Sequence, residues 1–443
     1  MSELQNMFGR PIPRPIAAII LPFVCTYLTK EDPITSILKR KARATCNGGK
    51  KDGKAVAVAE TYATCVEQPA CRVYWAMTAQ LCLIALGADA GNAFAEAPPA
   101  TEPFYMRIDD QFREWCWTEC KGCPPIPPGY VLPVNHALQG HPEAPRLWER
   151  HIHDILVKQL HFVPTTHEKC LYSQRDAEDK LQMILRQVDD FSVSATEQQD
   201  CRDIIEQIGT HLTVPLNDLG IIRKFNVVNI QQTKWYIKIS CEDYLLKILQ
   251  QHDWLQLKAA ALPIPMRSDS KYQRELETTA HPTTPDEQHH IQQQAGFSFL
   301  MASTGELIYA LIVARMEISF AIIKLSQYNA NPALIHYKAL REIFAYLNHT
   351  REDGLIYWRS CPRQDLPEVT PTPPQSNPQD RLPTYVQPPL SLLAYTSTPT
   401  GAVIHHTDDQ YLVEQSVYFP ELRFFSVQST KKQQHYSAPK QNL

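Results

Sequence analysis

The amino-acid sequence predicts an α+β fold of two or three domains, and three observations support this. The chain has 443 residues, which is enough for more than one hydrophobic core. Stretches with helical periodicity and apolar runs of strand length alternate irregularly, unlike the regular βαβ order of a doubly wound sheet. A segment with nine prolines in 28 residues, 362–389, is expected to be an extended, poorly packed linker to the short segment 390–443.

Apolar periodicity predicts the elements of the first part in chain order. The run 81–89 reads as a buried strand that ends in an acid, and 181–195 reads as a hairpin of two apolar strands. A strand followed by a helix is predicted in 235–252. Further helices are predicted in 144–160, 196–209, 305–328 and 336–350.

The charge balance does not mark the whole chain as a nucleic-acid binder. Lys and Arg number 43 against 47 Asp and Glu, so the net charge is −4. The charge is segregated, however, because residues 38–54 carry seven basic side chains and one acidic one. This basic run is either a solvated loop or a patch that contacts phosphates.

Cysteine content and hydropathy indicate an intracellular protein. Twelve cysteines without a secretory signal predict reduced thiols. Cys116, Cys120 and Cys123 have a faint zinc-ligand spacing, but the sequence offers no obvious second pair, so a structural metal is the weaker interpretation. The longest apolar run near the start, 15–25, is too short to span a bilayer, and we expect no membrane association.

One of the three Asp–Asp pairs has an unusual setting. Asp189 and Asp190 lie between two apolar runs at the turn of the predicted hairpin, whereas the pairs 109–110 and 408–409 lie in polar sequence and read as solvated turns. Burial of two like charges is costly unless a positive group neutralises them. The pair is therefore either part of a solvated turn, where aspartate is common, or part of a metal site.

A third carboxylate favours the metal-site interpretation of this pair. Asp89 ends another predicted strand and could meet Asp189 and Asp190 across a sheet. Three such carboxylates suit two divalent ions that activate a 3′-hydroxyl and stabilise a leaving pyrophosphate. Hard oxygen ligands favour Mg²⁺, with Mn²⁺ as the alternative.

The order of these motifs resembles that of a known family. Asp89 with Phe94 five residues later, "LQGHPEAPRLW" at 138–148, "QVDDF" at 187–191 and "LNDLG" at 216–220 are similar to the motifs of copia-type LTR-retrotransposon reverse transcriptases. The resemblance runs from about residue 13 to residue 358 and implies a right-hand polymerase. The implied domains are an N-terminal leader (1–12), fingers and palm (13–255), a helical thumb and connection region (256–361), the proline-rich linker (362–389) and a degenerate, truncated RNase H-like segment (390–443).

The resemblance also implies the roles of the acids and of one aromatic residue. Asp89, Asp189 and Asp190 would be the catalytic residues and the ligands of two Mg²⁺ ions. Phe94 would lie beneath the incoming sugar and exclude a ribose 2′-hydroxyl, although a core phenylalanine at a helix start is the simpler interpretation of that residue alone.

Further residues are implied in nucleotide and template binding. Gln139 and Gly140 would lie against the template and the nascent base pair. Lys41 and Arg43, in the basic run, would hold the triphosphate or the template. Gln187 stands where the family has an aromatic residue that contacts the primer end, so this contact is altered.

Other departures from the family pattern concern turns and the tail. "ARMEI" at 314–318 stands where the family has an Arg-Pro-Asp turn, so Glu317 replaces an Asp. "FNVVNI" has Val227 where a glycine is expected. Thr396 and Ser397 stand near the place of the first RNase H aspartate, so we expect the tail to lack RNase H activity.

Taken together, the residues and the resemblance predict an RNA-directed DNA polymerase. Its partners would be an RNA or DNA template with a primer and deoxynucleoside triphosphates, with no membrane. The alternatives are a catalytically inactive relic that binds nucleic acid and a two-metal nuclease. The implied location is intracellular, in a cytoplasmic virus-like particle with a nuclear phase left open, and the oligomeric state is open.

Overall fold

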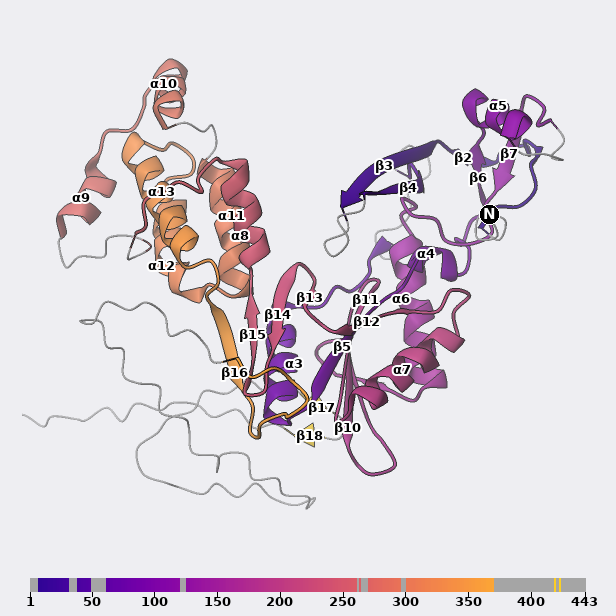
Figure 1. Ribbon diagram of the computed structural model, residues 1–443. Helices are drawn as coiled ribbons and strands as arrows, with labels where there is room; N and C mark the ends of the chain where they lie inside the picture. The colour runs from indigo at the N-terminus through magenta and orange to yellow at the C-terminus, as the bar shows by residue number, and fades with distance from the viewer. Residues whose placement is uncertain are drawn as a thin grey trace, which may run out of the picture.

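The computed structural model describes residues 7–31, 38–48, 61–119, 125–260, 263, 270–295, 300–369, 418–419 and 422–423. These residues form a mixed α/β structure, as the sequence predicts. Figure 1 shows a helical lobe, made of α8 to α13, on one side, and on the other a smaller lobe with β2, β6, β7 and α5, beside which lies the separate ribbon β3–β4. A six-stranded sheet lies below and between them, and we call it the central sheet.

The central sheet is antiparallel throughout, and its strands come from distant parts of the chain. Its order is β12 (Asn217–Ile221), β5 (Ile84–Asp89), β11 (Asp190–Ala195), β10 (Leu181–Gln187), β9 (Leu171–Arg175) and β8 (Val163–Pro164). All residues of β10 except the last are buried, and all residues of β11 except the first. Such continuous burial requires cover on both faces of the sheet.

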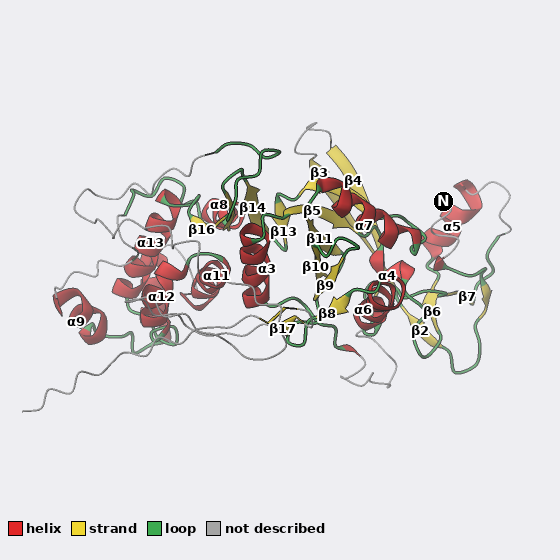
Figure 2. Ribbon diagram, turned by 90° about the horizontal axis from the view of Figure 1, so that it is seen from below, coloured by secondary structure: helices red, strands yellow, loops and turns green. Residues whose placement is uncertain are grey.

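Helices supply that cover. On one face, Phe191 and Val193 of β11 share a core with Trp148 of α6 (Ala144–Asp154) and with α7 (Gln198–Thr210). The π-helical turn η1 (Ile155–Gln159) continues α6. On the other face lies α3 (Gln68–Gln80), which Figure 2 shows between the central sheet and the helical lobe.

A second sheet connects the central sheet to the helical lobe. Its order is β13 (Lys224–Phe225), β14 (Val228–Gln232), β15 (Tyr236–Ser240) and β16 (Gly354–Trp358). The lobe consists of α8 (Glu242–Gln251), α9 (Ser270–Thr278), α10 (Pro285–Ala295), α11 (Leu300–Val313), the 3₁₀ turn η2 (Met316–Ile318), α12 (Ser319–Ser326) and α13 (Leu334–His349). One continuous hydrophobic core joins these helices, the second sheet and α3.

The smaller lobe contains short elements. Its sheet has the order β1 (Ile12–Pro13), β7 (Tyr130–Pro133), β6 (Phe104–Arg107) and β2 (Ile19–Leu21), with α5 (Asp110–Glu119) beside it. The long strands β3 (Phe23–Glu31) and β4 (Leu38–Cys46) form a separate ribbon, and α4 (Ala93–Glu96) follows β5. Of the tail 390–443, only β17 (Tyr418–Phe419) and β18 (Leu422–Arg423) are described, so the RNase H-like interpretation falls outside the described residues.

The helix predicted over 305–328 is broken in the structure. It ends at Val313, and Arg315 turns inward with only 1% of its side chain exposed. The Arg315 guanidinium donates to Glu317 Oε1 (2.6 Å) and to the carbonyl and hydroxyl oxygens of Thr350 (2.8 and 2.6 Å). The buried charge thus has one partner in the turn after the break and one at the end of α13, and the Arg–acid contact is made by a glutamate.

The start of the proline-rich segment packs against the central sheet. Arg359 donates to the carbonyls of Thr233 (3.0 Å) and Leu83 (2.7 Å), and Arg363 donates to those of Cys82 and Thr196 (both 2.7 Å). Leu366 is buried in the core beneath α6 and α7. Residues 362–369 are thus anchored at Arg363 and Leu366, while the other residues of this range are exposed; residues 370–389 lie outside the described residues, so the linker interpretation stays a prediction there.

Two further expectations concern the thiols and membranes. Cys82 and Cys361 form a disulfide, with Cα atoms 6.1 Å apart, so the prediction of reduced thiols throughout is wrong at this pair. Among the described residues no single helix is long and apolar enough to cross a membrane, although the bent pair of α10 and α11 passes that test together.

The hairpin between β13 and β14 explains why a glycine is expected at 227. Phe225 pairs with Val228, so Asn226 and Val227 form a two-residue loop, and both have positive φ (47° and 66°). Both central residues of a type I′ turn need this conformation, which is unfavourable for a β-branched residue. Val227 is 51% exposed, so little packing offsets the strain.

We predict that Val227→Gly stabilises the protein. Relief of the left-handed conformation should outweigh the added chain entropy of glycine and raise the free energy of unfolding by about 1 kcal/mol. The matched control is Val24→Gly in β3, a valine that is 37% exposed and lies outside the positive-φ residues, which should lower it by about 0.5–1 kcal/mol. Urea unfolding measures both, and a loss of stability in Val227→Gly would contradict the interpretation.

Candidate active site

The structure brings the predicted carboxylates together at one edge of the central sheet. Asp89 is the last residue of β5, Asp190 is the first residue of β11, and the two are direct cross-strand partners. Directly opposite residues in antiparallel strands have Cβ atoms about 4.5–5.5 Å apart. Asp189 lies in the turn that precedes Asp190. Three carboxylates from two distant parts of the sequence therefore meet.

The turn that carries Asp189 is tight and is anchored on both sides. Gln187 pairs with Asp190, so Val188 and Asp189 form a two-residue loop, with a positive φ of 55° at Val188. Trp148 Nε1 donates to the Val188 carbonyl (2.7 Å), and the Ala90 amide donates to the Asp189 carbonyl (2.9 Å). These bonds hold a strained β-branched residue and join the turn to the end of β5.

The electrostatics of the site are those of crowded like charges. Burial, and then the charges of Asp189 and Asp89, raise the pKa of Asp190 to about 6. No cation is among the groups that shift this pKa. The ionised trio is therefore unfavourable without a positive partner.

A divalent cation fits the chemistry of these donors. Carboxylate oxygens are hard ligands, and Mg²⁺ typically binds through one or two carboxylates, waters and substrate phosphates. In the described part of the chain, no three His, Cys, Asp or Glu side chains are arranged so that they alone could hold a metal ion. The trio can thus supply part of a coordination shell that a phosphate-bearing substrate would complete.

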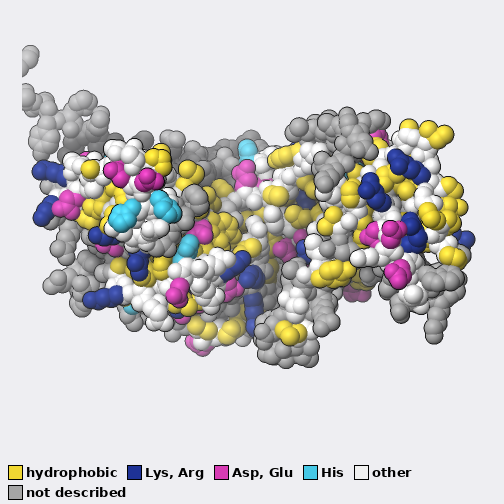
Figure 3. Space-filling view, turned by 90° about the horizontal axis from the view of Figure 1, so that it is seen from above, with side chains coloured by type: hydrophobic (Ala, Val, Ile, Leu, Met, Phe, Trp, Pro, Cys, Tyr) yellow, Lys and Arg dark blue, Asp and Glu magenta, His cyan; other side chains and the backbone are white. Residues whose placement is uncertain are grey.

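The site opens toward the space between the two lobes. In Figure 1, the edge where β5 leads into α4 faces the ribbon β3–β4 on one side and the helical lobe on the other. Figure 3, seen from above, shows the molecular surface set back between these lobes. Asp189 is exposed and Asp89 and Asp190 are partly exposed, so a ligand could reach these carboxylates from solvent.

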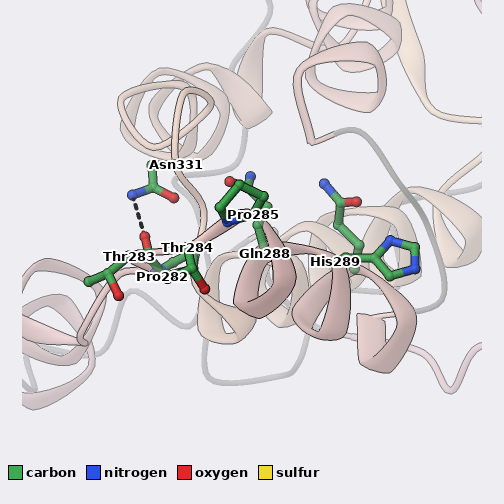
Figure 4. A pocket seen from close by; sticks show the side chains of 8 residues that line it. Pro282, Thr283, Thr284, Pro285, Gln288, His289 and Asn331 are labelled. Atoms are coloured by element: carbon green, nitrogen blue, oxygen red, sulfur yellow. Dashed lines mark hydrogen bonds between the residues drawn. The ribbon is translucent and has the colours of Figure 1, made fainter.

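A hollow in the described residues lies elsewhere, in the helical lobe. It has a volume of about 490 Å³ and is lined by residues of the helical lobe, among them Thr283, Thr284, His289 and Asn331 (Figure 4). Asn331 Nδ2 donates to the Pro282 carbonyl across it (3.0 Å). No acidic side chain lines this hollow, so it does not belong to the carboxylate site.

Phe94 lies close to the carboxylates in the chain but is only half-buried. It belongs to the short helix α4, which follows the left-handed residue Asn92, and it packs against the same core as Trp148. Both a packing role and a surface for a bound sugar are compatible with this position, so the role at the sugar stays a prediction.

Gly140 faces the protein's own backbone. Its φ is +94°, and an added Cβ would lie 2.0 Å from the Cys46 carbonyl oxygen. The Cys46 amide donates to the Gln139 carbonyl (2.9 Å). The turn 139–140 therefore supports the end of β4, and this contact explains the glycine before any approach of a template; template binding stays a prediction.

Gln187 has a partner that sequence reasoning missed. Its Oε1 accepts a hydrogen bond from the Val66 amide (2.9 Å). Glu149 accepts from the Thr64 amide (3.1 Å), and Glu168 accepts from the Glu67 amide (2.8 Å). Three acceptors thus hold residues 64–67, the segment that leads into α3, against the β10–β11 hairpin and its neighbours. No local pattern in the sequence predicts these contacts.

The basic candidates lie on the ribbon. Arg43 is exposed on β4, opposite Thr26, and the backbone of Lys41 pairs with Leu28. The side chain of Lys41 lies outside the described residues, as do those of Cys116, Cys120 and Cys123. The triphosphate and zinc interpretations of these residues stay untested.

Comparison with known proteins agrees with the motifs. Residues 22–266 match the family model described as reverse transcriptase (RNA-dependent DNA polymerase). The chain is 24% identical over 347 residues to a retrovirus-related Pol polyprotein from transposon TNT 1-94 of Nicotiana tabacum, which covers 77% of this chain and 24% of the relative. It is 27% identical over 233 residues to a putative transposon Ty5-1 protein of Saccharomyces cerevisiae, covering 52% of this chain and 68% of the relative. The chain thus spans about a quarter of the length of the tobacco relative.

We predict that Gly140→Ala destabilises the protein. The added Cβ cannot share space with the Cys46 carbonyl, and the positive φ adds strain, so the loss should be roughly 2–3 kcal/mol. Gly305→Ala in α11, where an added Cβ meets nothing within 4 Å, should instead be neutral or stabilising by up to about 1 kcal/mol. Equal effects of the two changes in urea unfolding would contradict the close contact.

We also predict that Asp190→Asn stabilises the metal-free protein at neutral pH. The folded pKa of about 6 lies above the unfolded value of 3.8, so the ionised Asp190 lowers the free energy of unfolding. This effect has its full size above pH 6. The gain, on the order of 1 kcal/mol after solvent screening, should shrink as the pH falls from 6 toward 3.8.

The measurement is urea unfolding of both proteins across this pH range, with and without millimolar Mg²⁺. Added Mg²⁺ should stabilise the wild type more than the variant, since it neutralises the charge that the variant lacks. The control is Asp110→Asn, at an aspartate whose side chain is 95% exposed, which should change neither response. A gain that grows toward low pH would contradict the assignment.

Proposed function

Because the chain belongs to the reverse transcriptase (RNA-dependent DNA polymerase) family, in its copia-type branch, we propose that it extends a primer along a template by nucleotidyl transfer. The observation that carries this proposal is the cross-strand pairing of Asp89 and Asp190 beside the Asp189 turn. The substrates would be deoxynucleoside triphosphates, and the template RNA or DNA.

The lobes support an assignment to the parts of a right-hand polymerase. The central sheet would be the palm, because it carries the carboxylates. The ribbon β3–β4 and the smaller lobe would be the fingers, and the helical lobe would be the thumb and connection region. A template–primer duplex would then lie in the space between the lobes, in contact with exposed basic residues such as Arg43. Binding through phosphates would weaken as the salt concentration rises.

The positions of the residues support the following roles in the reaction. Asp89, Asp189 and Asp190 would hold two Mg²⁺ ions, which when bound lower the pKa of the primer 3′-hydroxyl and stabilise the charge of the leaving pyrophosphate. The primer 3′-hydroxyl loses its proton to solvent water, its oxygen attacks the α-phosphorus, the bond from the α-phosphorus to the bridging oxygen breaks, and pyrophosphate leaves. The anchored Val188–Asp189 turn keeps one carboxylate at a constant place during this in-line displacement. Phe94, beside the same edge, would contact the sugar of the incoming nucleotide.

We predict that Asp189→Asn abolishes primer extension. With oligo(dT) on poly(rA), dTTP and Mg²⁺, the wild type should extend the primer and the variant should be slower by at least about 100-fold, the scale of removing a group that stabilises transition-state charge. Asp110→Asn, from the exposed aspartate pair, is the control and should keep full activity.

Three other outcomes have distinct meanings. No extension by folded wild type, with salt-dependent binding of the hybrid retained, would favour the inactive relic. Shortening of the primer would indicate a two-metal nuclease. Full activity of Asp189→Asn would remove the hairpin from the chemistry and overturn the proposed site.

A further inference from the structure

A line of buried hydroxyl groups joins α3 to the catalytic strand β11. Tyr74 Oη lies 2.8 Å from Ser192 Oγ and accepts a hydrogen bond from Ser194 Oγ at 2.5 Å. Thr78 Oγ1 lies 3.1 Å from Ser194 Oγ and donates to the Tyr74 carbonyl (2.7 Å). All four side chains are fully buried or nearly so. The cluster is closed, because each hydroxyl has a partner within it.

The spacing of these groups matches a helix to a strand. Tyr74 and Thr78 are four residues apart, about 6 Å along the axis of α3. Ser192 and Ser194 are two residues apart, about 6.8 Å along β11. The two pairs of hydroxyls can therefore meet at only one alignment of α3 along β11. A slip of one residue along β11 would point both serines to the opposite face.

The serines share a face of β11 with the catalytic carboxylate. Alternate residues of a strand point to the same side, so Asp190, Ser192 and Ser194 form one row, while Phe191 and Val193 form the apolar row on the opposite face. Tyr74 thus binds the two positions that follow Asp190 in its own row.

A polar cluster at this place does more than fill the core. Packing alone would be satisfied by apolar side chains of similar size, as on the other face of β11, without the cost of burying four hydroxyls. Directional hydrogen bonds instead specify one arrangement of helix and strand. Burial further raises the pKa of Tyr74, so its hydroxyl stays protonated and can donate.

We propose that Tyr74 is a positioning residue for nucleotidyl transfer, which sets the register of β11 and thereby the place of Asp190 opposite Asp89. This inference rests on the proposed function, because it assigns Tyr74 a role in holding the metal-binding carboxylates. Tyr74 touches neither substrate nor metal in this role; it acts through Ser192 and Ser194.

The first test is Tyr74→Phe, which removes one hydroxyl and keeps the ring. We expect kcat of primer extension to fall about tenfold, the scale of one buried hydrogen bond, and the Mg²⁺ concentration for half-maximal rate to rise about threefold. The KM for primer–template should change less than about twofold, since all four hydroxyls are buried and cannot touch nucleic acid. The control is Tyr337→Phe in α13, another tyrosine with about 1% exposure, which should leave all three quantities unchanged.

A triple variant separates positioning from stability. Tyr74→Phe with Ser192→Ala and Ser194→Ala removes the tyrosine hydroxyl together with the two serine hydroxyls that bonded to it, while Thr78 keeps its bond to the Tyr74 carbonyl. Its thermal stability should recover relative to Tyr74→Phe alone, because no buried polar group lacks a partner. Under the proposal kcat stays low, because the register is no longer specified. Recovery of kcat together with stability would show a merely structural role and overturn the proposal.

Amide hydrogen exchange gives a readout that does not depend on polymerase activity. Peptides that cover 188–195 should exchange faster in Tyr74→Phe than in the wild type and in Tyr337→Phe. Unchanged exchange there would overturn the positioning of β11. If the wild type extends no primer, the proposed function fails, and the exchange result still decides whether Tyr74 holds the strand.

Discussion

The mutual repulsion of three carboxylates is the constraint on which the rest of the site depends. Asp89 and Asp190 face each other across two strands, Asp189 follows in the turn, and the pKa of Asp190 is raised by its burial and by its two neighbours. Such an arrangement would relax by separation of the strands unless the surrounding structure held it. Three features act against this relaxation. They are the hydrogen bonds of the Val188–Asp189 turn, the contacts of the segment 64–67 with the hairpin, and the helices that cover both faces of the sheet.

Backbone strain occurs in the turn that carries Asp189. Val188 adopts a conformation that β-branched residues avoid, and Trp148 and Ala90 donate to the two carbonyls of the turn. Gly140 has a positive φ and sits against the Cys46 carbonyl, where no larger residue fits. Val227 has a similar strain but lies exposed and outside the site. Of these three positions, Val188 alone belongs to the carboxylate edge, and two hydrogen bonds to the turn hold its strained backbone.

Long-range connections join the site to the remote part of the chain. β16 pairs with β15 although more than a hundred residues separate them, and Arg359 and Arg363 then donate to carbonyls around the start of β5 and the end of β11. The helical lobe is thus tied to the central sheet by a sheet, a shared core and a set of charge-assisted hydrogen bonds. A bound duplex between the lobes would contact parts whose relative positions these ties determine.

By itself, the sequence determined the local elements and the chemical character of the site. Two apolar runs in 181–195 and the acid pair between them predicted the hairpin, and the ordered motifs predicted the family, because both signals lie within short windows. The tertiary structure alone decided that Asp89 stands opposite Asp190, that Gln187 accepts from Val66, that Gly140 meets Cys46 and that Tyr74 reaches two serines of β11. The break at Arg315 and the anchoring of Arg363 and Leu366 were missed for the same reason. Each of these contacts joins residues that no local period relates, and their free energy exists only once the helices and strands have packed.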